Sequence, residues 1–265
     1  MKYKIPINIP LKKIIDFFNK KKLNFVVEEC LRDSTKEDIF IDTPYKPDLY
    51  DLYRLYNLIS LNKRTTIVEF GTGWSTLIMI MALNENKKLF ENDVKKLRKN
   101  NPFEIFILEN DQKYLNISKK RINRFFKNKS IKNNIKIHWI YTVAKMTTYN
   151  GHICTQYSKL PLCNPDFIYS DGPGQFGIKG NVNNFSTNHK DIVPIGADLL
   201  MIEYFLIPGT MILIDGRTAN AKFLRDNFKR NWIYKRDHKY DQHIFYLNDD
   251  SLGVLNNKIL DFYNN

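Results

Sequence analysis

The stretch that best indicates the fold is Thr65-Thr66-Ile67-Val68-Glu69-Phe70-Gly71-Thr72-Gly73-Trp74-Ser75-Thr76. A short β-branched and apolar run ends in an acid, two glycines follow, and residues 77–83 then carry apolar side chains at helical spacing. This order predicts a buried strand, a tight turn and a helix. Glycines let the backbone turn sharply and let a ligand approach, and the free N–H groups of the helix point at that ligand. The alternative is an ordinary turn in which the glycines serve geometry alone.

Length and composition indicate a globular protein. The chain has 265 residues, 43% of them hydrophobic, which fits one large domain or one domain with an added cap. No apolar run reaches the roughly 18 residues that a membrane-spanning helix needs, and residues 1–10 lack the pattern of a signal peptide. The three cysteines are too scattered for a disulfide framework or a metal site, which favours a reducing cytoplasm.

The net charge of +13 raises the question of an anionic partner, such as nucleic acid, a membrane surface or an acidic substrate. The lysines are spread along the whole chain, with short runs only at 20–22 and 119–121. A nucleic-acid footprint should instead cluster on one face. The charge pattern therefore disfavours nucleic acid as the dedicated partner.

Further elements follow from apolar periodicity and from turn residues. Residues 11–31 and 48–61 have helical spacing, with breaks at 33–35 and 43–47. The polar, lysine-rich residues 84–101 are expected to form a solvated insertion. Later strands are predicted at 103–111, 135–141, 165–171, 210–217, 232–236 and 243–247, and helices at 114–122, 197–206, 218–230 and 252–263. Tyr45, Tyr50, Tyr53 and Tyr56 are expected to pack on the core, the alternative being a lid over a pocket.

Acids stand at the ends of four successive predicted strands: Glu69, Glu109, Asp171 and Asp215. Strands that alternate with helices indicate a parallel sheet covered on both faces. Right-handed crossovers then place these strand ends on one edge of the sheet, where ligands bind in open α/β folds. A long glycine- and asparagine-rich loop, residues 174–188, follows the fourth strand and is expected to be functional or mobile.

The acid before the glycines distinguishes this turn from a dinucleotide-binding one, which reads G-x-G-x-x-G with an acid about 20 residues further on. The form E-x-G-x-G, with an acid after the second strand, resembles the class I S-adenosylmethionine-dependent methyltransferases. The resemblance covers about residues 61–250 and rests on residues 69–73, 108–111, 168–173 and 213–217. It implies a Rossmann-like methyltransferase fold: α/β, doubly wound, with a mostly parallel seven-stranded sheet. We expect an N-terminal helical extension at 1–60, this domain at 61–250 and a C-terminal helical tail at 251–265.

The resemblance also implies how S-adenosylmethionine would be held. The expected cofactor-binding residues are Glu69, Gly71, Gly73, Ser75, Glu109 and Asp171. Glu69 would add negative charge near the cationic end of the cofactor, and Glu109 would accept both ribose hydroxyls through its two oxygens. Asn110 or Asp111 would help, or Asp111 would instead cap the next helix. Residues 141–144 would flank the adenine, and Asp171 would face the methyl group and the acceptor.

The motif after the fourth strand narrows the chemistry. Enzymes of this class that methylate base amino groups carry Asn/Asp-Pro-Pro-aromatic here, whereas this chain has Asp171-Gly172-Pro173-Gly174. Acids after both the fourth and fifth strands resemble the catechol-type O-methyltransferases, so Asp171 and Asp215 are candidate ligands for a divalent metal such as Mg²⁺. Gly216 replaces the amide neighbour of that metal site, which weakens the comparison.

Without a metal, an alcohol acceptor needs a general base. His152 and His189 are candidates, because a histidine near its ordinary pKa suits proton transfer. The expected catalytic residues are therefore Asp171, Asp215 and His189. Arg217 would bind an anionic substrate or form an ion pair with a nearby acid.

The sequence thus favours a cytoplasmic enzyme that transfers a methyl group from S-adenosylmethionine to a small-molecule acceptor. The most favoured reaction is O-methylation of a sugar or secondary metabolite. One alternative is methylation of RNA or protein, which the charge suggests. The other is a non-catalytic scaffold of the same fold. We expect no membrane partner, and an oligomer is left open.

Overall fold

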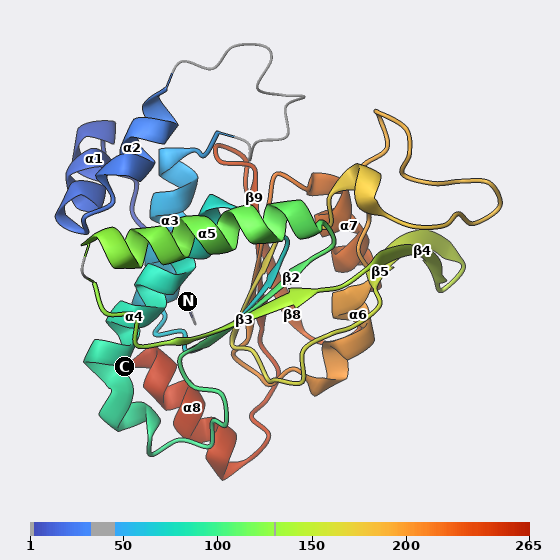
Figure 1. Cartoon of the computed structure of the whole chain (residues 1–265). Coiled ribbons are helices and arrows are strands. Elements are labelled where there is room, and N and C mark those ends of the chain that lie inside the picture. The colour runs from blue at the N-terminus through green and yellow to red at the C-terminus, as the bar shows by residue number, and fades with distance from the viewer. Residues whose placement is uncertain (1–2, 33–45, 130) are drawn as a thin grey trace.

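A computed structural model describes residues 3–32, 46–129 and 131–265 (Figure 1). Seven strands form one sheet in the order β3-β2-β1-β6-β7-β9-β8. Their bounds are β1 Thr66–Phe70, β2 Glu104–Glu109, β3 Lys136–Tyr141, β6 Phe167–Ser170, β7 Met211–Asp215, β8 Trp232–Asp237 and β9 Gln242–Leu247. Strand β9 runs in the direction opposite to the other six strands. The predicted fold class, a doubly wound and mostly parallel seven-stranded sheet, is confirmed.

Helices cover both faces of the sheet (Figure 1). Their bounds are α1 Leu11–Lys20, α2 Asn24–Leu31, α3 Leu49–Leu61, α4 Trp74–Val94, α5 Gln112–Lys129, α6 Asp198–Ile202, α7 Thr218–Asn227 and α8 Val254–Asn264. Side chains alternate along the strands, so Ile67 packs on one face with α1–α5 and α8, while Val68 packs on the other with α6 and α7. Among the described helices, none is both long and apolar enough to cross a bilayer.

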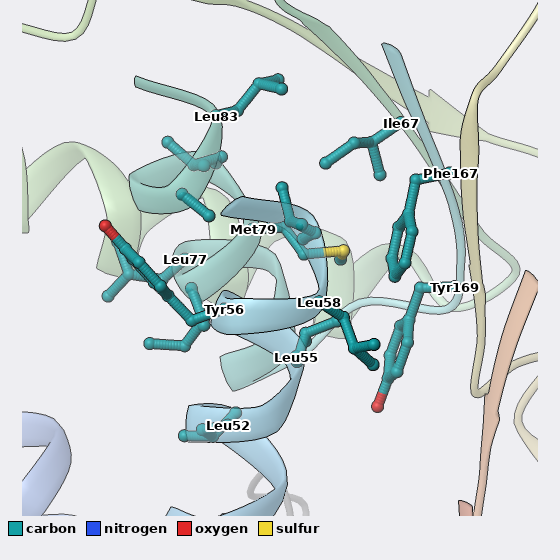
Figure 2. Close-up of a cluster of buried hydrophobic side chains, with 14 of the residues drawn as sticks. Leu52, Leu55, Tyr56, Leu58, Ile67, Leu77, Met79, Leu83, Phe167 and Tyr169 are labelled. Carbon is teal, nitrogen blue, oxygen red and sulfur yellow. The ribbon is translucent and has the colours of Figure 1, made fainter. Parts of the chain in front are cut away.

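The hydrophobic core on the Ile67 face of the sheet joins the N-terminal helices to the strands (Figure 2). Leucines of α3, among them Leu52 and Leu55, are buried together with side chains of α4, β1 and β6. Tyr53 and Tyr56 are buried in the same core, as expected. The ring of Tyr50 lies 6.0 Å from that of Tyr240, and Tyr45 lies outside the described residues.

Two expectations about the first half of the chain are corrected. Residues 11–31 form two helices with a break at 21–23, where Lys22 has a φ of 63°. The expected insertion at 84–101 is wrong up to Val94, because α4 continues through it. Asn86 is buried there, and its amide donates to the carbonyls of Ile59 and Arg64 at 3.1 and 2.8 Å. The predicted breaks at 33–35 and 43–45 lie outside the described residues.

A two-stranded hairpin that was not predicted follows β3 and precedes β6 along the chain. Its strands are β4 Ala144–Tyr149 and β5 His152–Tyr157. Its turn is Asn150-Gly151, with φ values of 47° and 79°. Asn-Gly is a strong signal for a two-residue hairpin turn, so the sequence held the information. The hairpin buries Ala144, Cys154 and Tyr157 on the face that carries α6 and α7. Figure 1 shows it projecting from the sheet beside the loop that follows β6.

At the opposite edge from the expected site, Asp166 fixes the beginnings of β1 and β6. It is fully buried and accepts from Thr65 N at 2.9 Å, Thr66 N at 3.0 Å and the Tyr263 hydroxyl at 2.9 Å. It also forms a buried ion pair with Lys99. Burial alone would raise the pKa of Asp166, but the nearby cations outweigh burial and lower it.

Candidate functional site

The turn after β1 is built on two glycines. Gly71 has a φ of 97°, a left-handed conformation that favours glycine, and its N–H donates to the carbonyl of Leu108 at 2.8 Å. Gly73 is the residue before α4 and has no side chain with which to cap that helix. A Cβ atom on Gly172, in the turn after β6, would lie only 2.5 Å from Gly71 N. The two turns are therefore in direct backbone contact at the carboxyl edge of the sheet.

Glu69 ties the glycine turn to α4. Its side chain is 1% exposed, and its two oxygens accept from the hydroxyls of Ser75 and Thr76, each at 2.7 Å. The same Thr76 hydroxyl accepts from Gly73 N at 3.1 Å. Burial raises the pKa of Glu69 to about 8; the two hydroxyls oppose this, and Asp171 and Glu109 add to it. Both Glu69 and Ser75, two of the expected cofactor-binding residues, thus hold the turn in shape.

Glu109, at the end of β2, is buried beside the glycine turn. Its Oε1 accepts from Asn110 N at 2.7 Å and Asp111 N at 2.8 Å, and the N–H of Thr72 also donates to the carboxylate. Burial raises the pKa of Glu109 to about 7 against these donors. The Asp111 side chain accepts from Lys113 N at 2.7 Å and so caps α5, which is one of the two roles expected for this residue.

Asn110 connects the end of β2 to the loop after β6. Its Oδ1 accepts from Gly174 N at 3.1 Å, and a Cβ on Gly177 would clash with its Nδ2. That Nδ2 atom is buried, and no residue in the described part of the chain forms a hydrogen bond with it. A buried amide with a free donor leaves a place that a ligand acceptor can fill. In the segment expected to flank an adenine, Tyr141 is half-exposed and Thr142 is buried.

Arg217 clamps the turn after β6. Its Nε lies 3.2 Å from Asp171 Oδ1, its Nη2 donates to the Asp171 carbonyl at 2.6 Å, and its Nη1 donates to the Pro173 carbonyl at 3.2 Å. The structure therefore shows the ion-pair alternative for this arginine. The Asp171 side chain is 56% exposed, yet enough protein surrounds it to raise the pKa of its carboxyl, with Arg217 opposing.

Asp215, at the end of β7, accepts from the Tyr169 hydroxyl at 3.0 Å and from the Gln242 amide. Burial, and then the charge of Asp171, raise the pKa of Asp215 to about 7. The described residues hold no cluster of three or more His, Cys, Asp or Glu side chains that could bind a metal. The Arg217 cation is paired with one of the two candidate carboxylates, and a divalent metal at Asp171 and Asp215 stays a prediction.

The two candidate histidines lie at the periphery of this edge. His189 is 63% exposed in the loop after β6, where its Nδ1 accepts from Asp191 N at 3.2 Å. His152 is exposed on the hairpin, and its ring lies 6.4 Å from that of Phe223 in α7. In the described part of the chain neither histidine forms a hydrogen bond or ion pair with the acids at the strand ends. The carboxylates, not the histidines, are what the fold gathers here.

One residue of this edge was missed. Asp51, in the first turn of α3, accepts from Gln242 Nε2 at 3.2 Å, and Gln242 also bonds Asp215. Asp51 and Gln242 are 191 residues apart, so no local pattern could have joined them. Asp51 comes from the predicted N-terminal extension, whose boundary at residue 60 stays a prediction.

The strand order, the single antiparallel strand β9 and the glycine turn after β1 define a Rossmann-like methyltransferase fold. No protein-family model and no curated protein sequence matches the chain.

Among solved structures, the chain is similar to the O-methyltransferase TomG from Streptomyces achromogenes, in complex with SAM. The identity is 12%, with 92% of each chain covered and a TM-score of 0.38. It is also similar to an O-methyltransferase from Bacillus cereus in complex with SAH, at 13% identity, 92% and 94% coverage and a TM-score of 0.38. A third is cofactor-bound Rv0187 from MTB, at 10% identity, 92% and 100% coverage and a TM-score of 0.43. All three likenesses are remote.

Proposed function

We propose that the chain is an S-adenosylmethionine-dependent methyltransferase that acts on a small-molecule acceptor, with oxygen as the favoured atom. The observation that carries the proposal is the Glu109 carboxylate, which lies beside the glycine turn and bonds Thr72 N. A carboxylate at the end of the second strand, next to an open turn, is placed to accept the hydroxyls of a ribose.

Other features of the turn fit the rest of the cofactor. The first N–H groups of α4 lack a side-chain cap, because Gly73 precedes them, and they suit the carboxylate of an amino-acid tail. A Cβ on Gly73 would meet only Ser75 Oγ, at 3.7 Å, so the space in front of this residue is open. Bound S-adenosylmethionine supplies a methyl group already activated on a positive sulfur. The nearby charges of Asp171 and Glu109 favour that cation, and the work left to the protein is to orient the acceptor.

The acids at this edge favour a neutral or cationic acceptor over a nucleic acid. Glu109, Asp171 and Asp215 gather at the strand ends, and the Arg217 cation is already paired with Asp171. A phosphate backbone brought to the methyl donor would meet this negative charge. A sugar or secondary metabolite with a free hydroxyl meets no such repulsion. Methylation of RNA or protein, or a scaffold that has lost the activity, are the alternatives.

We propose that the protein acts in the cytoplasm and that its partner is not a membrane. All three cysteines are free thiols, and burial raises the pKa of Cys30 to about 12, which keeps this thiol in its unreactive protonated form. Such thiols suit a reducing compartment.

Calorimetric titration with S-adenosylmethionine tests the cofactor. We expect binding by the parent chain and at least tenfold weaker binding by Glu109→Gln, since a carboxylate acceptor is replaced by an amide. Glu104→Gln is the matched control: it changes the same residue type at the other end of β2, where Glu104 pairs with His138 at 2.6 Å. No heat from the parent at millimolar cofactor would favour the scaffold.

The acceptor class needs its own measurement. Binding to bulk RNA across a range of salt concentrations should be weak at physiological salt. Tight binding with a steep salt slope would instead favour an RNA substrate.

A further inference from the structure

A pocket opens at the edge of the sheet where β1 and β6 begin. It has a volume of about 630 Å³ and lies between the α4–β2 connection, the β5–β6 connection and the start of α8. Thr66, the first residue of β1, lines it, whereas the turn at Gly71 follows the other end of that strand. Figure 1 shows α8 far from the β4–β5 hairpin. The pocket is therefore separate from the site at the strand ends, and its volume is in the range of about 300–1,000 Å³ typical of small-molecule sites.

One wall of this pocket is aliphatic. It is formed by six side chains: Leu162, Ile207, Leu252, Val254, Leu255 and Ile259. Three of them are open to solvent, since Leu162 is 100% exposed, Val254 71% and Leu252 66%. Apolar side chains that are grouped and exposed in this way mark a binding surface. None of the described residues that line the pocket is aromatic, so the wall suits an alkyl chain better than a nucleobase, which stacks on rings.

The charged residues of the pocket favour an anion. Arg98 and Lys99 line it, and none of the described lining residues is an aspartate or glutamate. Lys99 already has partners, because its Nζ pairs with Asp166 and donates to the Tyr263 hydroxyl at 3.1 Å. Arg98 is exposed, and among the residues with described structure none forms a hydrogen bond or ion pair with its guanidinium. This free cation can pair with a carboxylate through two parallel N–H groups.

Hydrogen bonds hold the walls of the pocket in place. Asn256 of α8 donates to the Pro208 carbonyl at 3.3 Å and accepts from Leu252 N at 3.1 Å. On the α4–β2 connection, the Asn101 carbonyl accepts from Thr66 Oγ1 at 2.9 Å. A ligand would therefore enter a pocket that is already formed, without the entropic cost of ordering a loop.

We propose that this pocket binds a free fatty acid, with the alkyl chain on the aliphatic wall and the carboxylate on Arg98. The proposal combines the apolar wall with an unpaired cation at its margin, which is the arrangement that an apolar chain with one anionic end requires. It does not depend on the proposed methyl transfer, because the pocket lies at the opposite end of the strands.

The test is calorimetric titration of the full chain with octanoate and with dodecanoate, each kept below the concentration at which it forms micelles. Each buried methylene raises affinity about fourfold. Dodecanoate should therefore bind at least tenfold more tightly than octanoate.

Two substitutions with matched controls locate the ligand. Leu162→Ser should weaken dodecanoate binding at least fivefold, whereas Leu89→Ser, at a leucine that is 63% exposed on α4 outside the pocket, should leave it unchanged. Arg98→Gln should also weaken binding at least fivefold. Lys96→Gln removes the same charge from a neighbour that pairs with Asp93 outside the pocket, and it should have little effect. Because Leu162 and Arg98 are exposed, both variants should unfold at the same urea concentration as the parent.

Three results would overturn the proposal: no binding of dodecanoate by the parent, equal affinities for octanoate and dodecanoate, or equal affinities of Leu162→Ser and Leu89→Ser for dodecanoate. Equal losses in Arg98→Gln and Lys96→Gln would show that only the net charge matters, which would overturn the pairing of the carboxylate with Arg98.

Discussion

The contact between the turns after β1 and β6 predicts a large effect for Gly172→Ala. The new Cβ would lie 2.5 Å from Gly71 N, 2.7 Å from Gly71 Cα and 2.8 Å from the carbonyl carbon of Phe70. All three are backbone atoms of a buried strand end, so no side chain can rotate away. Ordinary carbon contacts begin near 3.5 Å, which means that one turn must move by roughly 1 Å.

Overpacking of this kind costs about 2–3 kcal/mol. For a domain of this size, that free energy lowers the midpoint of thermal unfolding by about 4–10 °C. In urea the unfolding midpoint should fall by about 1 M, with an unchanged slope. Affinity for S-adenosylmethionine should fall as well, because the displaced turn carries Gly71 and lies beside the N-terminus of α4.

Gly174→Ala provides the matched control two residues further on. Its Cβ would meet only Asn110 Oδ1, at 3.9 Å, which is ordinary contact. Its stability should stay within about 0.5 kcal/mol of the parent, as for a substitution without a clash. The reasoning is refuted if Gly172→Ala unfolds at the same urea concentration as Gly174→Ala.

Three further predictions concern charged groups. Burial raises the pKa of Glu69 to about 8, so the folded state keeps a proton that the unfolded state loses at lower pH. The free energy of unfolding should therefore fall between about pH 5 and pH 8. Urea titrations should find that this pH dependence is weaker in Glu69→Gln. Asp166→Asn should lower the free energy of unfolding in urea by about 3–5 kcal/mol, because it leaves the buried Lys99 cation without its ion-pair partner. A loss of less than about 1 kcal/mol would contradict this expectation. Arg217→Gln should raise the pKa of Asp171 further, because the guanidinium lowers that pKa in the parent chain. The pKa of Asp171 can be followed by ¹³C NMR of its carboxyl carbon, and an unchanged value in the variant would contradict the expectation.

Most of the fold could be predicted because its signals are local. The run Ile67 to Phe70 with its glycines marks the first strand, and three later predicted strands end in or beside an acid, Glu109, Asp171 or Asp215. The convergence of Glu69, Glu109, Asp171 and Asp215 on one edge follows from topology alone once the strands are parallel.

What could not be predicted depends on contacts between distant segments. A polar stretch such as 84–94 looks solvated, but Asn86 is buried because the last turn of α3 and the turn before β1 each offer it a carbonyl. The pairing of Asp51 with Gln242 likewise exists only after α3 has packed on the sheet. The histidines at 152 and 189 were proposed because imidazole suits proton transfer, a property of the residue type that says nothing about where the chain places them.

Arg54 makes the N-terminal helices hard to exchange. Its guanidinium joins α3 to the tip of the β8–β9 hairpin through Asp237, Gln242 and Tyr240. A shortened chain that starts after α3 would leave a buried glutamine and an aspartate without their cation. A graft from another protein would have to supply an arginine at the same turn of its own helix. This helix is therefore not an interchangeable module, and any minimal version of the α/β domain must retain it.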